Sequence, residues 1–233
     1  MVDKKISVAI TVFNEAENLS KTISDFLEFL EKKKYNYKFW IFDNNSNDGS
    51  QKIIDIFTKN PRVKHFKHET NKGYAYNNFS ALKIPKADIY IIIDGDGQYS
   101  PKDIERFLRK LDTCDLVIGH RKIRKDPIVR LLMSKVLNML ARIIIKVDIK
   151  DINCGYKVLN SKLAKSLKIK YFYNYINPEL FAFCKKNNFK VEDLSVKHFS
   201  RTGGKSYFSG ITHIIKNILL MIKYLFQVRR DYL

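Results

Sequence analysis

With 233 residues and a formal net charge of +19 at pH 7, the chain is long enough for one substantial hydrophobic core and is strongly basic. Such a charge favours an anionic partner: nucleic acid, an anionic membrane surface or a phosphorylated substrate. The three cysteines (Cys114, Cys154 and Cys184) are odd in number and widely spaced, which argues against a disulfide framework or a cysteine-ligated metal and fits a reduced, cytosolic setting. No signal peptide and no uninterrupted apolar span of membrane length is apparent.

Five segments have the composition of strands, and a helical pattern follows each of the first four. The strands are expected at 5–12, 37–42, 63–66, 90–93 and 115–119. The fourth, Tyr90 to Ile93, is apolar throughout, as in a strand that is buried on both faces. Strands that alternate with helices predict an α/β fold with a mostly parallel, doubly wound sheet.

Polar residues follow four of these strands at the point where each ends. They are Phe13-Asn14-Glu15, Asp43-Asn44, Asp94 with Asp96, and His120-Arg121. Ligands of open parallel sheets bind outside the carboxyl ends of the strands, so these four clusters are expected to converge on one edge. The sequence has neither a Gly-x-Gly-x-x-Gly fingerprint nor a Walker A motif, which gives no support to an ordinary dinucleotide or P-loop site.

The segment Asp94-Gly-Asp-Gly-Gln98 predicts a metal and diphosphate site. Its two carboxylates repel each other unless a cation lies between them, and carboxylate oxygens suit Mg²⁺ or Mn²⁺. Gln98 is a third candidate ligand, and Gly95 lets a bulky anion approach the backbone. A plain turn and a phosphatase-type Asp-x-Asp nucleophile are alternatives. An EF-hand loop is not favoured, because Tyr99 stands where that loop needs glycine.

The second half of the chain holds two long amphipathic helical patterns. One runs from Ile128 to Val147 and the other begins near Gly210; each sets an apolar stripe against basic residues. Each pattern is compatible with a helix that packs on its own domain and with a helix at a membrane interface. Pro178 opens another expected helix, in which Glu179 is either a first-turn helix acid or a functional group.

Taken together, five ordered motifs resemble the family 2 glycosyltransferases of the GT-A fold, and within them the polyprenyl-phosphate (dolichol-phosphate mannose synthase-like) branch. The motifs are Thr11-Val-Phe-Asn-Glu-Ala-Glu-Asn-Leu19, Phe42-Asp-Asn-Asn-Ser-Asn-Asp-Gly-Ser50, Asp94-Gly-Asp-Gly-Gln98, Gly119-His-Arg121 and Arg201-Thr-Gly-Gly-Lys-Ser206. The resemblance covers about residues 4–207. It implies a GT-A catalytic domain at 1–207, followed by a basic amphipathic C-terminal helix at 208–233.

The resemblance also implies roles for individual residues. Asp43 would read the base of a nucleotide, while Asn44 replaces the usual second acid and leaves the choice between UDP and GDP open. Asp151, in a segment similar to the family's Asp-x-x-x-Gly-Tyr/Phe element, would lie near the acceptor. The implied metal ligands are Asp94, Asp96 and Gln98; the catalytic residues are Asp94, Asp96, Asp151, Arg121 and Arg201; the nucleotide-sugar-binding residues are Thr11, Phe13, Glu15, Asp43, Asn44, Lys72, Asp94, Gly95, Asp96, Arg121, Arg201 and Lys205.

The activity implied is a Mg²⁺- or Mn²⁺-dependent, inverting transfer of a hexose from a nucleotide sugar to a polyprenyl phosphate. The enzyme would act at the cytosolic face of an anionic membrane, as a peripheral protein, with a homo-oligomer or a membrane partner subunit as a further possibility. One alternative acceptor is a glycan or glycolipid hydroxyl, which would need Asp151 or Glu179 as a base. A nucleic-acid-binding module is a remote alternative, because the basic residues are spread along the chain and Asp94 and Asp96 would have no purpose in it.

Overall fold

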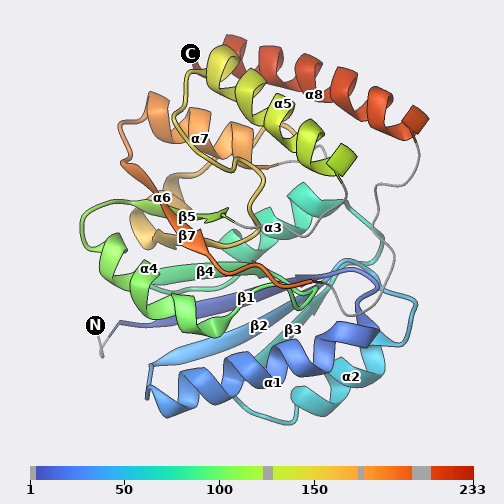
Figure 1. The fold of residues 1–233 in the computed structure, drawn as a ribbon. Coiled ribbons are helices and arrows are strands. Elements are labelled where there is room, and N and C mark those ends of the chain that lie inside the picture. The colour runs from blue at the N-terminus through green and yellow to red at the C-terminus, as the bar shows by residue number, and fades with distance from the viewer. Residues whose placement is uncertain (1–3, 123–127, 173–175, 201–210) are drawn as a thin grey trace.

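The computed structural model of the chain describes residues 4–122, 128–172, 176–200 and 211–233 (Figure 1). Seven strands form one sheet in the order β3-β2-β1-β4-β6-β5-β7. Only β6 runs antiparallel to its neighbours, so the sheet is mostly parallel, as predicted. The strands are β1 (Ile6–Val12), β2 (Tyr37–Asp43), β3 (Val63–Lys67), β4 (Ile89–Asp94), β5 (Leu116–Arg121), β6 (Lys157–Asn160) and β7 (Val191–Val196).

Helices cover both faces of the sheet. In Figure 1, α1, α2 and α4 lie on one face and α3, α6 and α7 on the other, with α5 and α8 side by side in a further layer beyond α7. The bounds are α1 (Ala16–Lys32), α2 (Ser50–Phe57), α3 (Tyr74–Lys83), α4 (Ile104–Leu111, after the 3₁₀ turn Pro101–Asp103), α5 (Ile128–Ile145), α6 (Ser161–Ser166), α7 (Asn177–Lys186) and α8 (Ile211–Tyr232).

The five predicted strands are present, but β6 and β7 are not among them. β6 has only four residues, which is too short for a periodic pattern to be recognised. β7 places Glu192 and Asp193 in the middle of an edge strand that is only partly buried, so its composition is that of a loop. Both strands lie on the β5 side of β4 and complete the half of the sheet that the sequence analysis leaves open.

The C-terminal helix packs on the rest of the protein through the face that carries Met221, Tyr224, Leu225 and Val228, which are buried against α5 and α7. The apolar stripe predicted for this helix includes Leu219, Leu225 and Phe226; Leu225 is buried, whereas Leu219 and Phe226 are exposed. The packed face is therefore turned relative to the predicted one. In the described part of the chain, no helix is long and apolar enough to cross a bilayer.

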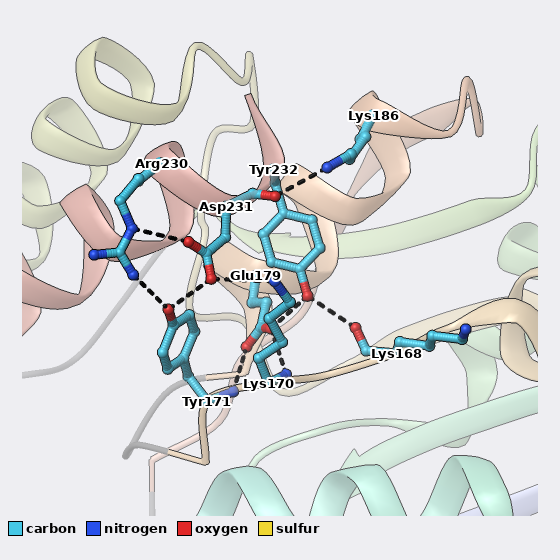
Figure 2. Close-up of polar contacts among 8 residues, drawn as sticks. All are labelled: Lys168, Lys170, Tyr171, Glu179, Lys186, Arg230, Asp231 and Tyr232. Atoms are coloured by element: carbon cyan, nitrogen blue, oxygen red, sulfur yellow. Dashed lines mark hydrogen bonds and ion pairs between the residues drawn. The ribbon is translucent and has the colours of Figure 1, made fainter.

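Polar contacts fix the last turn of α8 to the body of the protein (Figure 2). The hydroxyl of Tyr232 lies 2.6 Å from Oε1 of the buried Glu179 and 2.9 Å from the carbonyl oxygen of Lys168. The backbone N–H groups of Lys170 and Tyr171 donate to the two oxygens of the same carboxylate. Glu179 thus joins α7, the segment 168–171 and α8, and burial raises the pKa of its carboxyl group.

We expect the substitution Tyr232→Phe to lower the free energy of unfolding by about 1 to 2 kcal/mol, because it removes a buried hydroxyl that bonds to a charged group. Urea denaturation followed by circular dichroism measures this loss. Tyr171→Phe is the control, since its hydroxyl bonds to Asp231 at a more exposed position and should cost less. Equal effects of the two substitutions would show that Glu179 does not anchor the helix.

Candidate active site

Asp94 and Asp96 stand at the carboxyl end of β4, which is the fourth strand of the seven in spatial order. The chain turns sharply after them because Gly97 has a φ of +76°, a conformation that a side chain disfavours. Both aspartates are partly accessible, and the backbone N–H of Gln98 donates to Asp96 Oδ1 at 3.2 Å. The turn presents two carboxylates at the edge where the parallel strands end.

Three residues from other elements position the carboxylate of Asp94. Tyr74, the first residue of α3, donates its hydroxyl to Asp94 Oδ1 at 2.9 Å, and the hydroxyl of Thr11 on β1 lies 3.5 Å from the same oxygen. Burial, and then the charge of Asp94, raise the pKa of Tyr74, so its hydroxyl stays a donor at neutral pH. Gly155 lies against the second oxygen of the same carboxylate, where an added Cβ would be 1.9 Å from Asp94 Oδ2.

We expect Tyr74→Phe to reduce kcat/KM for the reaction at this site by about 10- to 100-fold, because a hydrogen bond to a charged group is worth about 1.5 to 3 kcal/mol. Steady-state kinetics measures the change. Tyr76→Phe is the matched control: Tyr76 lies two residues further along α3 and 37% of its surface is exposed. If both variants retain wild-type kinetics, Tyr74 does not support Asp94 in catalysis.

The buried carboxylate of Asp43 ends β2 on the other side of β1. Its Oδ1 accepts hydrogen bonds from the backbone N–H and the hydroxyl of Ser46, at 2.9 and 2.6 Å. Its Oδ2 is buried and has no hydrogen-bond partner within the described residues. A buried acceptor without a donor is costly, so a ligand N–H group at this position would be bound favourably.

Asn44 closes the loop beside Asp43. Its side-chain N–H donates to Asn71 Oδ1 at 2.7 Å, and its Oδ1 accepts from the backbone N–H of Lys72 at 2.9 Å. A carboxylate could not make the first of these bonds, because it has no donor. The departure from an acid at this position therefore has a structural reason: the amide ties the end of β2 to the segment that precedes α3.

The remaining residues expected at the nucleotide lie at the same edge. Phe13 follows β1 and is 38% exposed. The backbone N–H of Glu15 donates to the hydroxyl of Ser50 at 3.2 Å, which joins the segment after β1 to the start of α2. Lys72 is exposed in the segment after β3, and a Cβ on Gly95 would come within 3.0 Å of the Thr11 carbonyl oxygen. The structure thus brings these residues together around the β1, β2 and β4 ends, while their roles stay predictions.

Arg121 and Asp151 form a buried ion pair. The Nε of Arg121 donates to Asp151 Oδ2 at 2.6 Å and its Nη2 donates to Oδ1 at 2.9 Å, and the two side chains are 9% and 7% exposed. Burial opposes the charge of Arg121, but the hydrogen bonds that it donates to Asp151 raise its pKa above the ordinary value. The sequence analysis expects these residues in separate roles, at the phosphates and at the acceptor; the structure shows them bonded to each other.

Two of the predicted site residues, Arg201 and Lys205, lie outside the described residues. The chain that leads toward them passes the acidic turn, because Gln98 bonds twice to Phe199. The side-chain N–H of Gln98 donates to the Phe199 carbonyl oxygen at 3.0 Å, and the Phe199 N–H donates to the Gln98 carbonyl oxygen at 2.9 Å.

The carboxylates at this edge fit a divalent cation whose coordination is completed by the oxygens of a bound diphosphate. Among the residues whose positions are described, no three His, Cys, Asp or Glu side chains come close enough to hold a metal by themselves. Asp94 and Asp96 offer two carboxylates, and Mg²⁺ is commonly bound by one or two carboxylates together with phosphate oxygens. Asp94, Asp96 and Gln98 remain the proposed ligands.

The sequence analysis misses four residues that shape this edge. Tyr74 and Lys157 contact or face Asp94, Gly155 makes room for it, and the side chain of Asn177 donates to the carbonyl oxygens of Ile152 and Cys154 at 2.8 and 3.2 Å. Gly155 has a signal, because it belongs to the motif that contains Asp151. Lys157 lies in the same segment, but its burial near Asp94 depends on β6. Tyr74 and Asn177 have no signal, since their contacts join elements that are far apart in the sequence.

A mostly parallel sheet with an acidic turn at the carboxyl end of a central strand is the arrangement of the GT-A class of glycosyltransferases. The sequence model of glycosyl transferase family 2 matches residues 7–167, more than half of the chain. The chain therefore belongs to glycosyl transferase family 2 and is a glycosyltransferase. The predicted family and the predicted fold class are both confirmed.

Several relatives carry names that include a polyprenyl phosphate. The dolichol-phosphate mannosyltransferase of Pyrococcus furiosus is 29% identical over 71% of this chain and 49% of its own length. The polyprenol monophosphomannose synthase of Mycolicibacterium smegmatis is 27% identical over 70% of this chain and 64% of its own. The chain therefore spans about half to two thirds of the length of these relatives.

Solved structures of glucosyl-3-phosphoglycerate synthase from Mycobacterium tuberculosis share the fold. Its complex with phosphoglyceric acid has a TM-score of 0.70 and 14% identity, covering 99% of this chain and 80% of that one. A second complex of the same enzyme holds Mn²⁺, uridine diphosphate and glucosyl-3-phosphoglycerate, with a TM-score of 0.68 over 97% of this chain and 78% of that one.

Proposed function

We propose that the protein transfers a hexose from a UDP- or GDP-linked sugar to a polyprenyl phosphate, with Mg²⁺ or Mn²⁺, at the cytosolic face of an anionic membrane. The donor side is supported by the unpaired Asp43 oxygen and by the acidic turn at 94–96. The names of the relatives support the acceptor.

One observation carries the choice of a phosphate acceptor: both oxygens of Asp151 are held by Arg121. A carboxylate in such a pair is a poor general base, since its lone pairs are engaged and its partner favours the ionised form. Glu179, the other expected base, is bonded to Tyr232 and to two backbone N–H groups in the anchor of α8. A phosphate monoester needs no base, because its oxygen is already anionic at neutral pH.

The proposed reaction is a single displacement at the anomeric carbon. An oxygen of the acceptor phosphate forms a bond to that carbon while the bond to the nucleoside diphosphate breaks, so the products are the polyprenyl phosphate sugar and the free nucleoside diphosphate. One displacement inverts the configuration. A bound divalent cation would offset the charge that accumulates on the leaving diphosphate. The hydrogen bond from Tyr74 and the close approach of Gly155 fix the Asp94 carboxylate at the edge where that cation would bind.

A transfer assay tests this proposal. Labelled UDP-glucose and GDP-mannose are each supplied with dolichyl or undecaprenyl phosphate in detergent, with Mn²⁺ or Mg²⁺. We expect label to enter the lipid fraction from one donor, and no label to enter when the acceptor is the corresponding polyprenol without phosphate. Transfer to hydroxyl acceptors alone would contradict a phosphate acceptor.

The alternative acceptor, a glycan or glycolipid hydroxyl, is favoured by one observation. His120, at the end of β5, has its Nδ1 2.7 Å from Asp193 Oδ1 without hydrogen-bond geometry, which places an imidazole beside a carboxylate as a candidate base. His120→Gln separates the two acceptors: it should abolish transfer to a hydroxyl and change transfer to a phosphate by less than about fivefold.

We propose further that the outer layer formed by α5 and α8 contacts the membrane. On α5, Leu132, Val136, Met139 and Ile143 recur at helical spacing and are 41% to 62% exposed. On α8, Leu219 and Phe226 are 63% and 55% exposed. Exposed basic residues flank both sets (Lys135, Arg142, Lys223 and Arg229). An apolar stripe between cations suits an anionic bilayer surface, where the apolar groups insert and the cations pair with headgroups.

Vesicle flotation tests this surface. Ile143→Glu should reduce binding to phosphatidylglycerol vesicles at least about fivefold, because it places a charge among inserted apolar groups. Ile56→Glu is the matched control, because Ile56 on α2 is 63% exposed and Ile143 is 62% exposed. Equal retention of both variants on vesicles would contradict this orientation.

A further inference from the structure

Lys157 is a buried lysine that faces the acidic turn. It opens β6, where it lies opposite Ile92 of β4 and Ile118 of β5. Residues directly opposite in an antiparallel pair point to the same face of the sheet, and so do residues two apart along a strand. Lys157 therefore shares a face with Asp94, two residues beyond Ile92.

The ammonium group of Lys157 has no hydrogen-bond partner among the described residues. The side chain is 1% exposed, and its Nζ lies 5.9 Å from the centre of the Tyr74 ring. A buried lysine without a hydrogen-bond partner is rare in protein interiors and is costly, and the face of the Tyr74 ring offsets only part of that cost. Burial lowers the pKa of Lys157, and the charge of Asp94 opposes that shift. Lys157 is thus buried at a cost to stability, on the same face of the sheet as the Asp94 carboxylate to which Tyr74 donates.

We propose that Lys157 makes binding of a divalent cation at Asp94 and Asp96 conditional on the nucleoside diphosphate. The ammonium attracts the Asp94 carboxylate and repels a cation placed beside it, so the two carboxylates alone bind the cation weakly. A diphosphate brings additional oxygen ligands and negative charge to the same edge, which offsets the repulsion from Lys157. Cation and nucleotide then bind with positive coupling. This inference rests on the proposed donor site and deepens it.

Calorimetry with Mn²⁺ alone tests the inference. The variant Lys157→Met removes the charge and keeps an unbranched side chain that suits a buried position. We expect it to bind Mn²⁺ at least about tenfold more tightly than the wild type, because one positive charge that repels the ion is removed. With UDP or GDP present, the wild type should gain at least about tenfold in Mn²⁺ affinity, and Lys157→Met should gain distinctly less.

Three comparisons separate this role from packing. Lys157→Arg keeps the charge and should retain weak Mn²⁺ binding. Lys162→Met makes the same change at an exposed position on α6, beyond the opposite edge of the sheet, and should leave Mn²⁺ affinity unchanged. Melting temperatures show that the variants fold; if Lys157→Met does not, Lys157→Gln takes its place.

A Mn²⁺ dissociation constant for Lys157→Met within about twofold of the wild type would overturn the inference, because the charge would then have no effect on the cation. That result differs from a failure of the proposed function. If the wild type bound neither UDP nor GDP in the presence of Mn²⁺, the donor site would be wrong, whereas the comparison with Mn²⁺ alone concerns Lys157 and Asp94 only.

Discussion

Replacing Gly155 by alanine should lower transferase activity at least about 100-fold while the protein still folds. The added Cβ would lie 1.9 Å from Asp94 Oδ2 and 2.4 Å from Asp94 Cγ, which is far inside van der Waals contact. Asp94 must then move, and its hydrogen bond to Tyr74 is lost. Because a displacement of about 1 Å at a catalytic group can cost about two orders of magnitude in rate, this single methyl group should remove nearly all of the transferase activity.

The control for Gly155→Ala is Gly49→Ala. Gly49 has a φ of +98°, but a Cβ there would meet nothing within 4 Å, so the substitution strains the backbone without striking a neighbour. It should cost about 1 kcal/mol of stability and little activity. Kinetics and thermal melts of both variants decide the matter. Near-normal activity of a folded Gly155→Ala protein would mean that the position of Asp94 does not govern catalysis.

Removing the guanidinium in Arg121→Ala should destabilise the protein by about 3 to 5 kcal/mol, because it leaves the buried Asp151 carboxylate without its partner. The two side chains are 9% and 7% exposed, so water compensates for little of the loss. The double variant Arg121→Met with Asp151→Leu should recover most of this stability, since it removes both charges and keeps apolar volume in the same place. Urea denaturation of the single and double variants measures the effects.

An exposed ion pair provides the comparison for Arg121. Lys21 and Asp25 pair on α1 with side chains that are 78% and 46% exposed, and Lys21→Ala should cost less than about 1 kcal/mol. If Arg121 and Asp151 lie where the acceptor binds, the double variant Arg121→Met with Asp151→Leu should remain folded but be inactive toward a lipid acceptor. A cost for Arg121→Ala as small as that for Lys21→Ala would show that the pair contributes no fixed structure to the site.

The parts of the fold that the sequence predicts are those with long apolar patterns. β1 and β4 are recognised because they are continuous or alternating apolar runs, and their ends place Asp94 at the edge without further information. β6 is not recognised from the sequence because it has four residues and depends on β4 and β5 for its hydrogen bonds. Without β6, neither the burial of Lys157 nor the close approach of Gly155 to Asp94 can be foreseen.

The candidate site shows the same division. Asp94, Asp96 and Asp43 are predicted because acids directly after strands have a local pattern. The pair of Arg121 with Asp151 is not predicted, although both residues are selected, because the bond depends on how the segment after α5 folds against β5. The hydroxyl of Tyr74 reaches Asp94 across 20 positions of sequence, and only the packing of α3 on the sheet brings them together.

Binding of nucleotides at the acidic edge is the central claim, and calorimetry tests it most directly. UDP and GDP are titrated into the wild type, Asp96→Ala and Asp112→Ala, with and without Mn²⁺. Asp112 is an exposed acid at the end of α4 and serves as the control for loss of one carboxylate. We predict micromolar, Mn²⁺-dependent binding of one nucleotide to the wild type and to Asp112→Ala, and none to Asp96→Ala. Absence of binding to the wild type under every metal condition, or unchanged binding to Asp96→Ala, would contradict the account.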